Sequence, residues 1–285
     1  MRSAHIAGWD RRRANAQVAL RRGAITAIAA TLESAVTNAD LIVLAAPLPA
    51  IEALIPRVLR VARSGALVLD VGPLKYRVVT IARKHLRNLL ARPASRSRDY
   101  RGGPFFVAGH PMAGRERSGP NAASADLFEG RPFALYAPEQ PHGKLARRSA
   151  RAIVIALGAL PVWLEPAAHD RAVASTSALP QLAAIALARA TQRMLGRARY
   201  KLAGPGFESA TRLAGSPFHV WDAAIFGNAK NVRRALAILA SELAALGSLL
   251  ERGQRAEMAK RFRAAAAARR RILAIPRRRS SARDS

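Results

Sequence analysis

Short apolar runs alternate with longer amphipathic stretches from the N-terminus to residue 164. Continuous apolar runs are typical of strands covered on both faces, as in a parallel sheet, and the longer stretches have helical periodicity. The pattern predicts strands at 5–10, 41–46, 66–71, 105–108, 132–136 and 160–164. It predicts helices at 11–22, 51–62, 74–90 and 144–157. This alternation indicates a doubly wound α/β domain with a parallel sheet.

The pattern changes near residue 169, where Ala- and Leu-rich helical periodicity replaces the alternation. It predicts helices at 170–195, 220–228 and 232–250, with a Gly-, Pro- and Ser-rich break at 203–217. We therefore expect two domains, residues 1–164 and 165–276. The basic tail at 277–285 has little to bury, and we expect it to be disordered.

Composition narrows the class of protein. Half of the 285 residues are hydrophobic, which excludes global disorder, and no apolar run is long enough to span a membrane. The absence of cysteine excludes disulfides and Cys-ligated zinc. Because the N-terminal residues lack the apolar core of a signal peptide, we expect a soluble, cytoplasmic protein.

The net charge is +29, from 47 basic and 18 acidic residues, and only six of the basic residues are Lys. The excess is spread along the chain, so general compositional bias explains it better than a single binding patch. Aromatic residues make up only 5% of the chain, which disfavours base stacking. We expect no nucleic-acid binding beyond nonspecific charge attraction.

Two polar residues lie at or just after the ends of predicted strands, where open α/β sheets bind ligands. His110 lies in a Gly- and Pro-containing loop, Gly109–Gly114, and suits general-base work, although a lone His is more often structural. Asp10 could accept hydrogen bonds from a dinucleotide ribose, or it could simply cap the next helix. The remaining histidines show no metal-ligand spacing, and we interpret Asp170 as a charge in the first turn of a helix.

Five segments along the chain carry distinctive motifs. The longest is 105–133, which contains the run GHPMAG, and the others are AAP at 45–47, DVGPLK at 70–75, HDRAVASTSALPQL at 169–182 and AGPGFESATRLA at 203–214. In their sequence, order and spacing, these segments resemble the prephenate/arogenate dehydrogenase family of tyrosine biosynthesis.

This resemblance implies a Rossmann-like nucleotide-binding domain followed by an all-helical domain that forms a homodimer. It implies oxidative decarboxylation of prephenate to 4-hydroxyphenylpyruvate, with hydride transfer to NAD+. Arogenate as the substrate and NADP as the cofactor stay open, although Asp10 would repel the extra phosphate of NADP.

The resemblance also assigns roles to individual residues. His110 matches the catalytic histidine that hydrogen-bonds the substrate hydroxyl. The positions matched to substrate binding are Arg212, Gln181, Ser177 and Lys75. Those matched to cofactor binding are Asp10, Arg11, Ala45, Ala46, Pro47, Val71 and Gly72. No metal is implied.

The chain departs from the family pattern at three places. It contains no Gly-x-Gly-x-x-Gly turn, so we expect it to begin at what corresponds to the family's second strand. Pro73 stands where the family has serine, and Ala178 stands in a stretch where the family has histidine. These departures leave a second hypothesis, a non-catalytic dimeric remnant of the family.

Overall fold

The computed structural model describes residues 4–90, 103–114 and 119–274. The predicted tail at 277–285 lies outside these ranges. The chain divides into two compact units, residues 1–228 and 229–285. The predicted domain boundary at residue 164 falls inside the first unit and stays a prediction.

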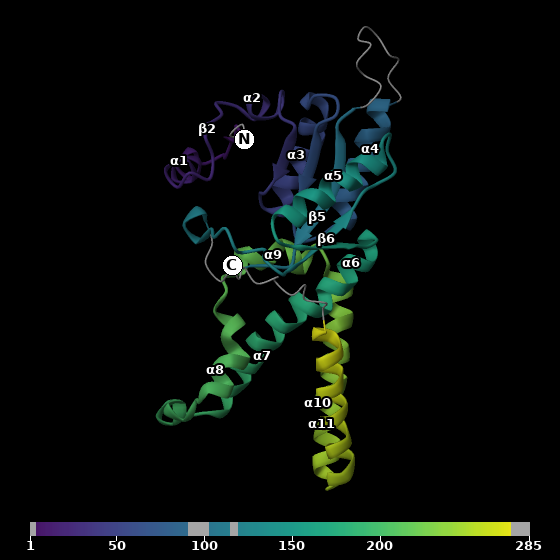
Figure 1. Ribbon diagram of the computed structural model, residues 1–285. Coiled ribbons are helices and arrows are strands. Elements are labelled where there is room, and N and C mark those ends of the chain that lie inside the picture. The colour runs from purple at the N-terminus through teal and green to yellow at the C-terminus, as the bar shows by residue number, and fades with distance from the viewer. Residues whose placement is uncertain (1–3, 91–102, 115–118, 275–285) are drawn as a thin grey trace, which may run out of the picture. The chain divides into compact units, whose positions relative to one another are not determined.

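A five-stranded sheet forms the centre of the first unit (Figure 1). Its strands, in spatial order, are β3 (Leu41–Leu44), β4 (Leu67–Asp70), β5 (Phe105–Pro111), β6 (Pro132–Tyr136) and β7 (Leu160–Trp163). All neighbours pair in parallel except β5 and β6, which pair antiparallel. Five of the six predicted strands therefore form this sheet, and its one antiparallel pair, β5–β6, is not predicted by the sequence pattern.

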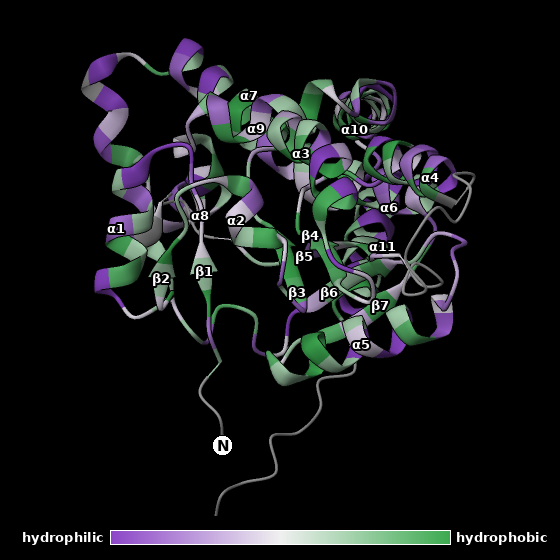
Figure 2. Ribbon diagram, turned by 90° about the horizontal axis from the view of Figure 1, so that it is seen from above, coloured by the Kyte–Doolittle hydropathy of each residue, from purple (hydrophilic) through white to green (hydrophobic). Residues whose placement is uncertain are grey.

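Helices cover both faces of this sheet, as the apolar runs require. α3 (Leu48–Val61) and α4 (Tyr76–Leu90) pack on one face, and α5 (Gly143–Ala156) packs on the other. Along β4, Val68 belongs to the first core, whereas Leu67 and Leu69 belong to the second. A strand buried on both faces has a continuous apolar sequence, and Figure 2 shows the central strands as hydrophobic.

The N-terminal segment forms a sheet of its own. β1 (Ala7–Gly8) and β2 (Ala27–Ile28) pair in parallel, with α1 (Arg13–Arg21) between them, and α2 (Leu32–Val36) follows. Neither β2 nor α2 is predicted by the sequence pattern, because both are too short to show periodicity. The Thr31 side chain caps α2 by accepting a hydrogen bond from the backbone N–H of Ser34.

The helix predicted at 170–195 differs from the structure at its start and in its middle. α6 (Pro166–Val173) begins four residues earlier, a π-helical turn η3 (Ala174–Ala178) follows, and α7 (Leu179–Met194) continues the path. Pro180 lacks the backbone N–H that a regular helix needs at this point, so the chain widens before it.

The predicted break at 203–217 contains ordered structure. After the turns of η4 (Arg197–Leu202), α8 (Pro205–Thr211) and η5 (Arg212–Gly215) lead into α9 (Phe218–Phe226). The prediction of a continuous break is wrong because Pro205 occupies the first helical turn, where proline is favoured, and Glu208 complements the helix dipole.

The second unit consists of two helices, α10 (Ala229–Glu251) and α11 (Arg255–Leu273). Gly253, at a φ of +63°, turns the chain between them. An ion pair of 2.8 Å joins Glu242 to Arg261 across the pair. In the described ranges of both units, every helix is too short or too polar to cross a bilayer.

Candidate functional site

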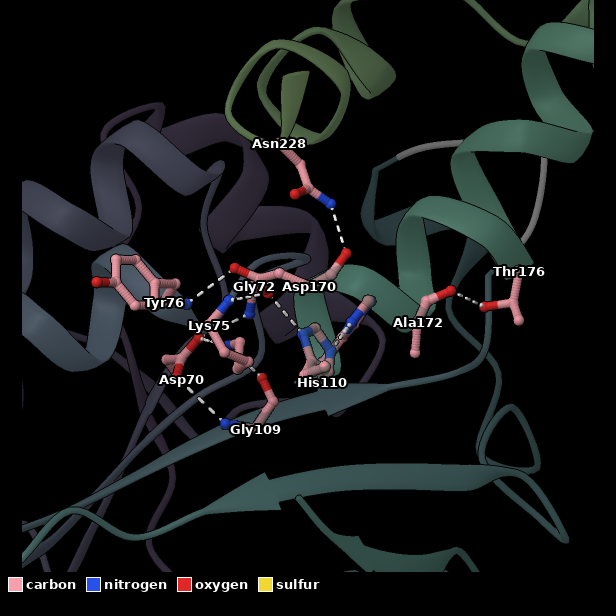
Figure 3. Close-up of polar contacts among 11 residues, drawn as sticks. Asp70, Gly72, Lys75, Tyr76, Gly109, His110, Asp170, Ala172, Thr176 and Asn228 are labelled. Carbon is pink, nitrogen blue, oxygen red and sulfur yellow. Dashed lines mark hydrogen bonds and ion pairs between the residues drawn. The ribbon is translucent and has the colours of Figure 1, made fainter. Parts of the chain in front are cut away.

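The carboxyl end of β4 and the loop that follows it carry a buried ion pair (Figure 3). Asp70 is the last residue of β4, and its carboxylate contacts the ammonium of Lys75 in the loop that follows. Both side chains are almost fully buried, with exposed fractions of 0% and 2%. The carboxylate also accepts a hydrogen bond of 3.0 Å from the backbone N–H of Gly72. Buried charges need such partners, and here each charge is satisfied.

This ion pair holds both backbone polar groups of Gly109. The N–H of Gly109 donates to Oδ1 of Asp70 at 3.2 Å, and its carbonyl oxygen accepts from Nζ of Lys75 at 2.6 Å. A Cβ atom at Gly109 would lie 2.7 Å from the Asp70 carbonyl oxygen and 2.8 Å from the Phe133 ring. The backbone that precedes His110 is therefore fixed by hydrogen bonds and by close packing.

The two charges of the pair respond to burial in opposite directions. Burial raises the pKa of Asp70, and the positive charge and hydrogen bond of Lys75 partly offset this rise. Burial lowers the pKa of Lys75, and Asp70 offsets that change in the same way. Removing either partner would leave the other as an uncompensated buried charge.

The His110 side chain contacts a second buried group on α6. Its Nδ1 lies 3.0 Å from Nε2 of His169, and Nδ1 of His169 lies 2.7 Å from Oδ1 of Asp170. His169 and Asp170 are buried, with exposed fractions of 2% and 6%. Three side chains from two distant segments therefore form one hydrogen-bonded row.

Asp170 also connects this row to the loop after β4. Its Oδ1 accepts from the backbone N–H of Lys75 at 2.8 Å, and its Oδ2 accepts from the backbone N–H of Tyr76 at 3.0 Å (Figure 3). The side-chain amide of Asn228 donates to the Asp170 carbonyl oxygen at 2.6 Å. The loop that carries the buried ion pair and the helix that carries His169 are thus held together.

The surroundings of His110 keep its ring neutral. Burial, the neighbouring His169 ring and the Lys75 ammonium together lower the pKa of His110 to about 2. A neutral imidazole has one nitrogen with a free lone pair, and it can accept a proton or a hydrogen bond. The ring is partly exposed, so it can meet a small molecule at the carboxyl edge of the sheet.

The residues matched to substrate binding lie in several environments. Gln181 is buried on α7, and its Nε2 donates to the carbonyl oxygen of Leu213 at 2.9 Å, next to Arg212. Its Oε1 is buried and has no hydrogen-bond partner among the described residues. Arg212 is exposed and lines a pocket beside α8, and Ser177 lies in the π-helical turn. Lys75 is buried, and its ammonium contacts the Asp70 carboxylate and the Gly109 carbonyl oxygen.

The residues matched to cofactor binding fall into two groups. Ala45, Ala46 and Pro47 follow β3, and Val71 and Gly72 follow the neighbouring β4. The backbone N–H of Val71 donates to the Leu44 carbonyl oxygen at 3.2 Å, which brings the two loops together.

Asp10 and Arg11 follow β1 in the separate two-stranded sheet, and both are exposed. The Asp10 carboxylate accepts from the backbone N–H of Arg12 at 2.6 Å and from the amide of Asn15 at 3.2 Å. It therefore stabilises the start of α1, and a cofactor role would add to this one. The roles of both groups stay predictions.

Two features of this site are not predicted from the sequence. The interpretation of Asp170 as a charge in a first helical turn is wrong, because α6 begins at Pro166 and both His169 and Asp170 are buried. The pairing of Asp70 with Lys75 is the second feature. The signal in the sequence was that Asp70 and Lys75, and likewise His169 and Asp170, are polar residues close together in largely apolar stretches. In the described residues, no three His, Asp or Glu side chains gather as metal ligands would.

Comparison with known proteins covers nearly the whole chain. Residues 1–160 match the model of the prephenate dehydrogenase nucleotide-binding domain, and residues 165–264 match that of its dimerization domain. A prephenate dehydrogenase from Bacillus subtilis is 30% identical over 222 residues, which are 76% of this chain and 55% of that protein. A probable prephenate dehydrogenase from Streptomyces niveus is 39% identical over 142 residues, 49% of this chain and 38% of that protein. The chain thus spans about half the length, or less, of these relatives.

Solved structures agree with the fold. A prephenate dehydrogenase from A. aeolicus, crystallised with hydroxyphenyl propionate and NAD+, has a TM-score of 0.78 at 23% identity, covering 95% of this chain and 90% of that one. An arogenate dehydrogenase from Synechocystis has a TM-score of 0.76 at 22% identity, covering 95% and 92%. The predicted Rossmann-like sheet followed by helices is confirmed. The two domain models together establish that the chain belongs to the prephenate dehydrogenase family.

Proposed function

We propose that this chain catalyses the oxidative decarboxylation of prephenate to 4-hydroxyphenylpyruvate with NAD+ as the hydride acceptor. The observation that carries the proposal is the position of His110. Its neutral ring lies at the carboxyl end of β5, on a backbone fixed by the Asp70–Lys75 pair. Carboxyl ends of parallel strands are where open α/β sheets bind ligands.

The part of the site assigned to the dinucleotide fits such a ligand. The loops at 45–47 and 71–72 lie side by side at the carboxyl ends of adjacent parallel strands, and Asp10 offers an exposed carboxylate for ribose hydroxyls. These residues would hold the cofactor, which would supply the hydride acceptor. The chain as given contains no glycine-rich turn, so pyrophosphate contacts are assigned to no residue.

His110 would act on the hydroxyl of the ring carbon that loses hydride. The O–H bond breaks as its proton passes to the imidazole, and the C–H electron pair leaves with the hydride. The electrons of the C–CO2 bond stay on the ring and make it aromatic as CO2 departs. The proton then returns from His110 to the phenolate oxygen, so no net proton is released. A residue that takes and returns a proton in this way acts as a general acid–base catalyst.

Arg212 would bind a substrate carboxylate. Its guanidinium can form two parallel hydrogen bonds to a carboxylate, which fixes orientation as well as charge. Gln181 supports this role because its amide holds the Leu213 carbonyl, one residue away from Arg212. Prephenate and arogenate both carry carboxylates, so both belong in the assay, with NAD+ and NADP+ as alternative cofactors.

We further infer that the protein works as a homodimer. The helices of the second unit expose large apolar side chains, among them Leu243, Leu250 and Phe262, with exposed fractions of 59%, 73% and 70%. Exposed apolar surface of this extent is typical of interaction surfaces. A mass measurement by light scattering would detect two copies, and a monomer at all concentrations would contradict the inference.

The proposed function is tested by the appearance of NADH with prephenate, together with calorimetric titration of NAD+. We expect His110→Asn to lower kcat by roughly 10²–10⁴-fold and to leave the Kd of NAD+ unchanged. His219→Asn is the matched control, because His219 is exposed on α9. Wild-type turnover in His110→Asn would contradict the role of His110. Absence of saturable NAD+ binding by the wild type would favour the non-catalytic dimeric hypothesis.

A further inference from the structure

The row of three side chains that ends at His110 restricts where protons can lie. Asp170 accepts three hydrogen bonds through its carboxylate, from the backbone N–H groups of Lys75 and Tyr76 and from the ring of His169. An ionised carboxylate only accepts hydrogen bonds. Nδ1 of His169, 2.7 Å away, therefore carries a proton.

This proton fixes the direction of the next hydrogen bond. In a neutral imidazole, one nitrogen donates and the other accepts. With its proton on Nδ1, a neutral His169 presents Nε2 as an acceptor to Nδ1 of His110 at 3.0 Å. The proton of His110 must then lie on its Nδ1. Its Nε2 keeps a free lone pair, and none of the described residues makes a recorded hydrogen bond to that atom.

We propose that His169, anchored by Asp170, is a positioning residue that holds His110 in the tautomer protonated on Nδ1, so that Nε2 is the atom that takes the substrate's proton. The inference rests on the proposed function for its catalytic meaning. It goes further by naming the reacting nitrogen and by assigning a role to two residues that would not touch the substrate. In a Ser-His-Asp triad, the aspartate contacts the catalytic histidine directly and fixes its tautomer. Here the ring of His169 lies between Asp170 and His110.

The hydrogen bonds of this row also respond when His110 becomes charged, a state that burial and the Lys75 ammonium oppose. When Nε2 of His110 gains a proton, its Nδ1–H becomes a stronger donor to His169, because hydrogen bonds from ionised groups are stronger. His169 in turn stays bound to the anionic Asp170. These hydrogen bonds therefore offset part of the cost of the positive charge, and the backbone N–H donors of Lys75 and Tyr76 keep Asp170 in place.

The decisive measurement is ¹⁵N NMR of histidine-labelled apo protein at neutral pH, which reports the protonated nitrogen of each ring. The chain has six histidines, and His110→Asn identifies the signals of His110 by their loss. We expect a single His110 tautomer with the proton on Nδ1 in the wild type. In His169→Ala we expect a mixture, or a shift of the proton to Nε2. In His169→Gln the side-chain oxygen can still accept from Nδ1, so we expect the original tautomer to return in part.

Kinetics provide the second measurement. We expect His169→Ala to lower kcat by roughly tenfold to hundredfold, less than His110→Asn, and to leave the Kd of NAD+ unchanged. His169→Gln should recover part of the loss, which a purely structural role would not predict. If His169→Ala does not fold, the wild type and His169→Gln still decide the matter.

A wild-type His110 protonated on Nε2, or a tautomer unaffected by His169→Ala, would overturn the inference. Absence of turnover with the expected NMR result would defeat the proposed function alone, because the tautomer is measured without substrate or cofactor.

Discussion

The ammonium of Lys75 lies 2.6 Å from the carbonyl oxygen of Gly109, a residue 34 positions later in the chain. This contact crosses from the loop after β4 to the strand β5. Gly109 directly precedes His110, so the buried Lys75 side chain helps to determine where the His110 ring lies. Two such contacts, from Lys75 and from Asp70, hold the same glycine.

The first prediction concerns this buried ion pair. Lys75→Met should lower the free energy of unfolding by about 3–5 kcal/mol, because Asp70 is left as an unpaired buried charge. Urea unfolding followed by circular dichroism measures the change. Lys84→Met is the matched control, since Lys84 is exposed on the neighbouring helix α4, and it should change stability by less than about 0.5 kcal/mol.

A double variant separates the charge from the packing. Asp70→Asn combined with Lys75→Met removes both charges, so its loss should be smaller than the two single losses added together. Strict additivity would show that the two side chains do not stabilise each other. A Lys75→Met protein as stable as the wild type would contradict the prediction outright.

The second prediction tests the close packing at Gly109. Gly109→Ala places a Cβ 2.7 Å from the Asp70 carbonyl oxygen and 2.8 Å from the Phe133 ring, so the backbone must shift. We expect a loss of about 1–3 kcal/mol in unfolding free energy and a fall in kcat, because His110 moves with the strand. Gly114→Ala is the control for stability, since its Cβ would meet no atom within 4 Å. Equal melting temperatures for the two variants would refute the expected strain.

Much of the sheet follows from the sequence, because strands covered on both faces need continuous apolar runs. The ranges predicted at 132–136 and 160–164 correspond closely to β6 and β7. β2 has only two residues in the structure, and a segment of that length shows no periodicity. The π-helical turn before Pro180 depends on a local hydrogen-bond pattern that a count of apolar positions does not report.

The candidate site was predicted in part. His110 is a candidate from the sequence because the composition of residues 109–114 is unusual and because the family resemblance marks it. Its predicted place in a loop is wrong, since β5 continues to Pro111 and His110 pairs with Ala134 of β6. The role of Asp170 depends on a contact with the backbone of Lys75, 95 residues away, which no local pattern contains. An adjacent His and Asp in an Ala-rich helical segment is a general sign of a buried polar pair. Without the fold, it does not reveal that His110 is the histidine that this pair contacts.

The third prediction concerns substrate affinity. Arg212→Ala should weaken prephenate binding by about 2–5 kcal/mol, seen as a higher KM with a smaller change in kcat, if the arginine pairs with a desolvated carboxylate. Arg212→Lys keeps the charge but loses the two-pronged geometry, so it should recover only part of the affinity. Arg199→Ala, an exposed arginine of the preceding turn η4, is the control. A KM unchanged in Arg212→Ala would remove Arg212 from the substrate site.

The fourth prediction is a pH dependence of stability that originates at His110. Burial, His169 and Lys75 lower its pKa in the folded protein to about 2, against an ordinary value of 6.5. Below pH 6.5 the unfolded chain therefore binds a proton that the folded protein excludes, so this contribution to stability is present above pH 6.5 and is lost as the pH falls. The charged and titratable groups around the ring are His169, Asp170, Lys75 and Asp70.

The size of this loss of stability depends on how far the pH lies below 6.5, the ordinary pKa that His110 has in the unfolded chain. At pH 5 the loss from His110 should be on the order of 2 kcal/mol, from about 1.4 kcal/mol per pH unit. Urea unfolding of the wild type and of His110→Asn at pH 7.5 and pH 5 isolates this contribution, since all other groups titrate in both proteins. We expect the wild type to lose about 2 kcal/mol more than the variant over this interval. Equal losses would show that His110 takes up its proton in the folded state as readily as in the unfolded chain, and that its ring is not held neutral by its surroundings.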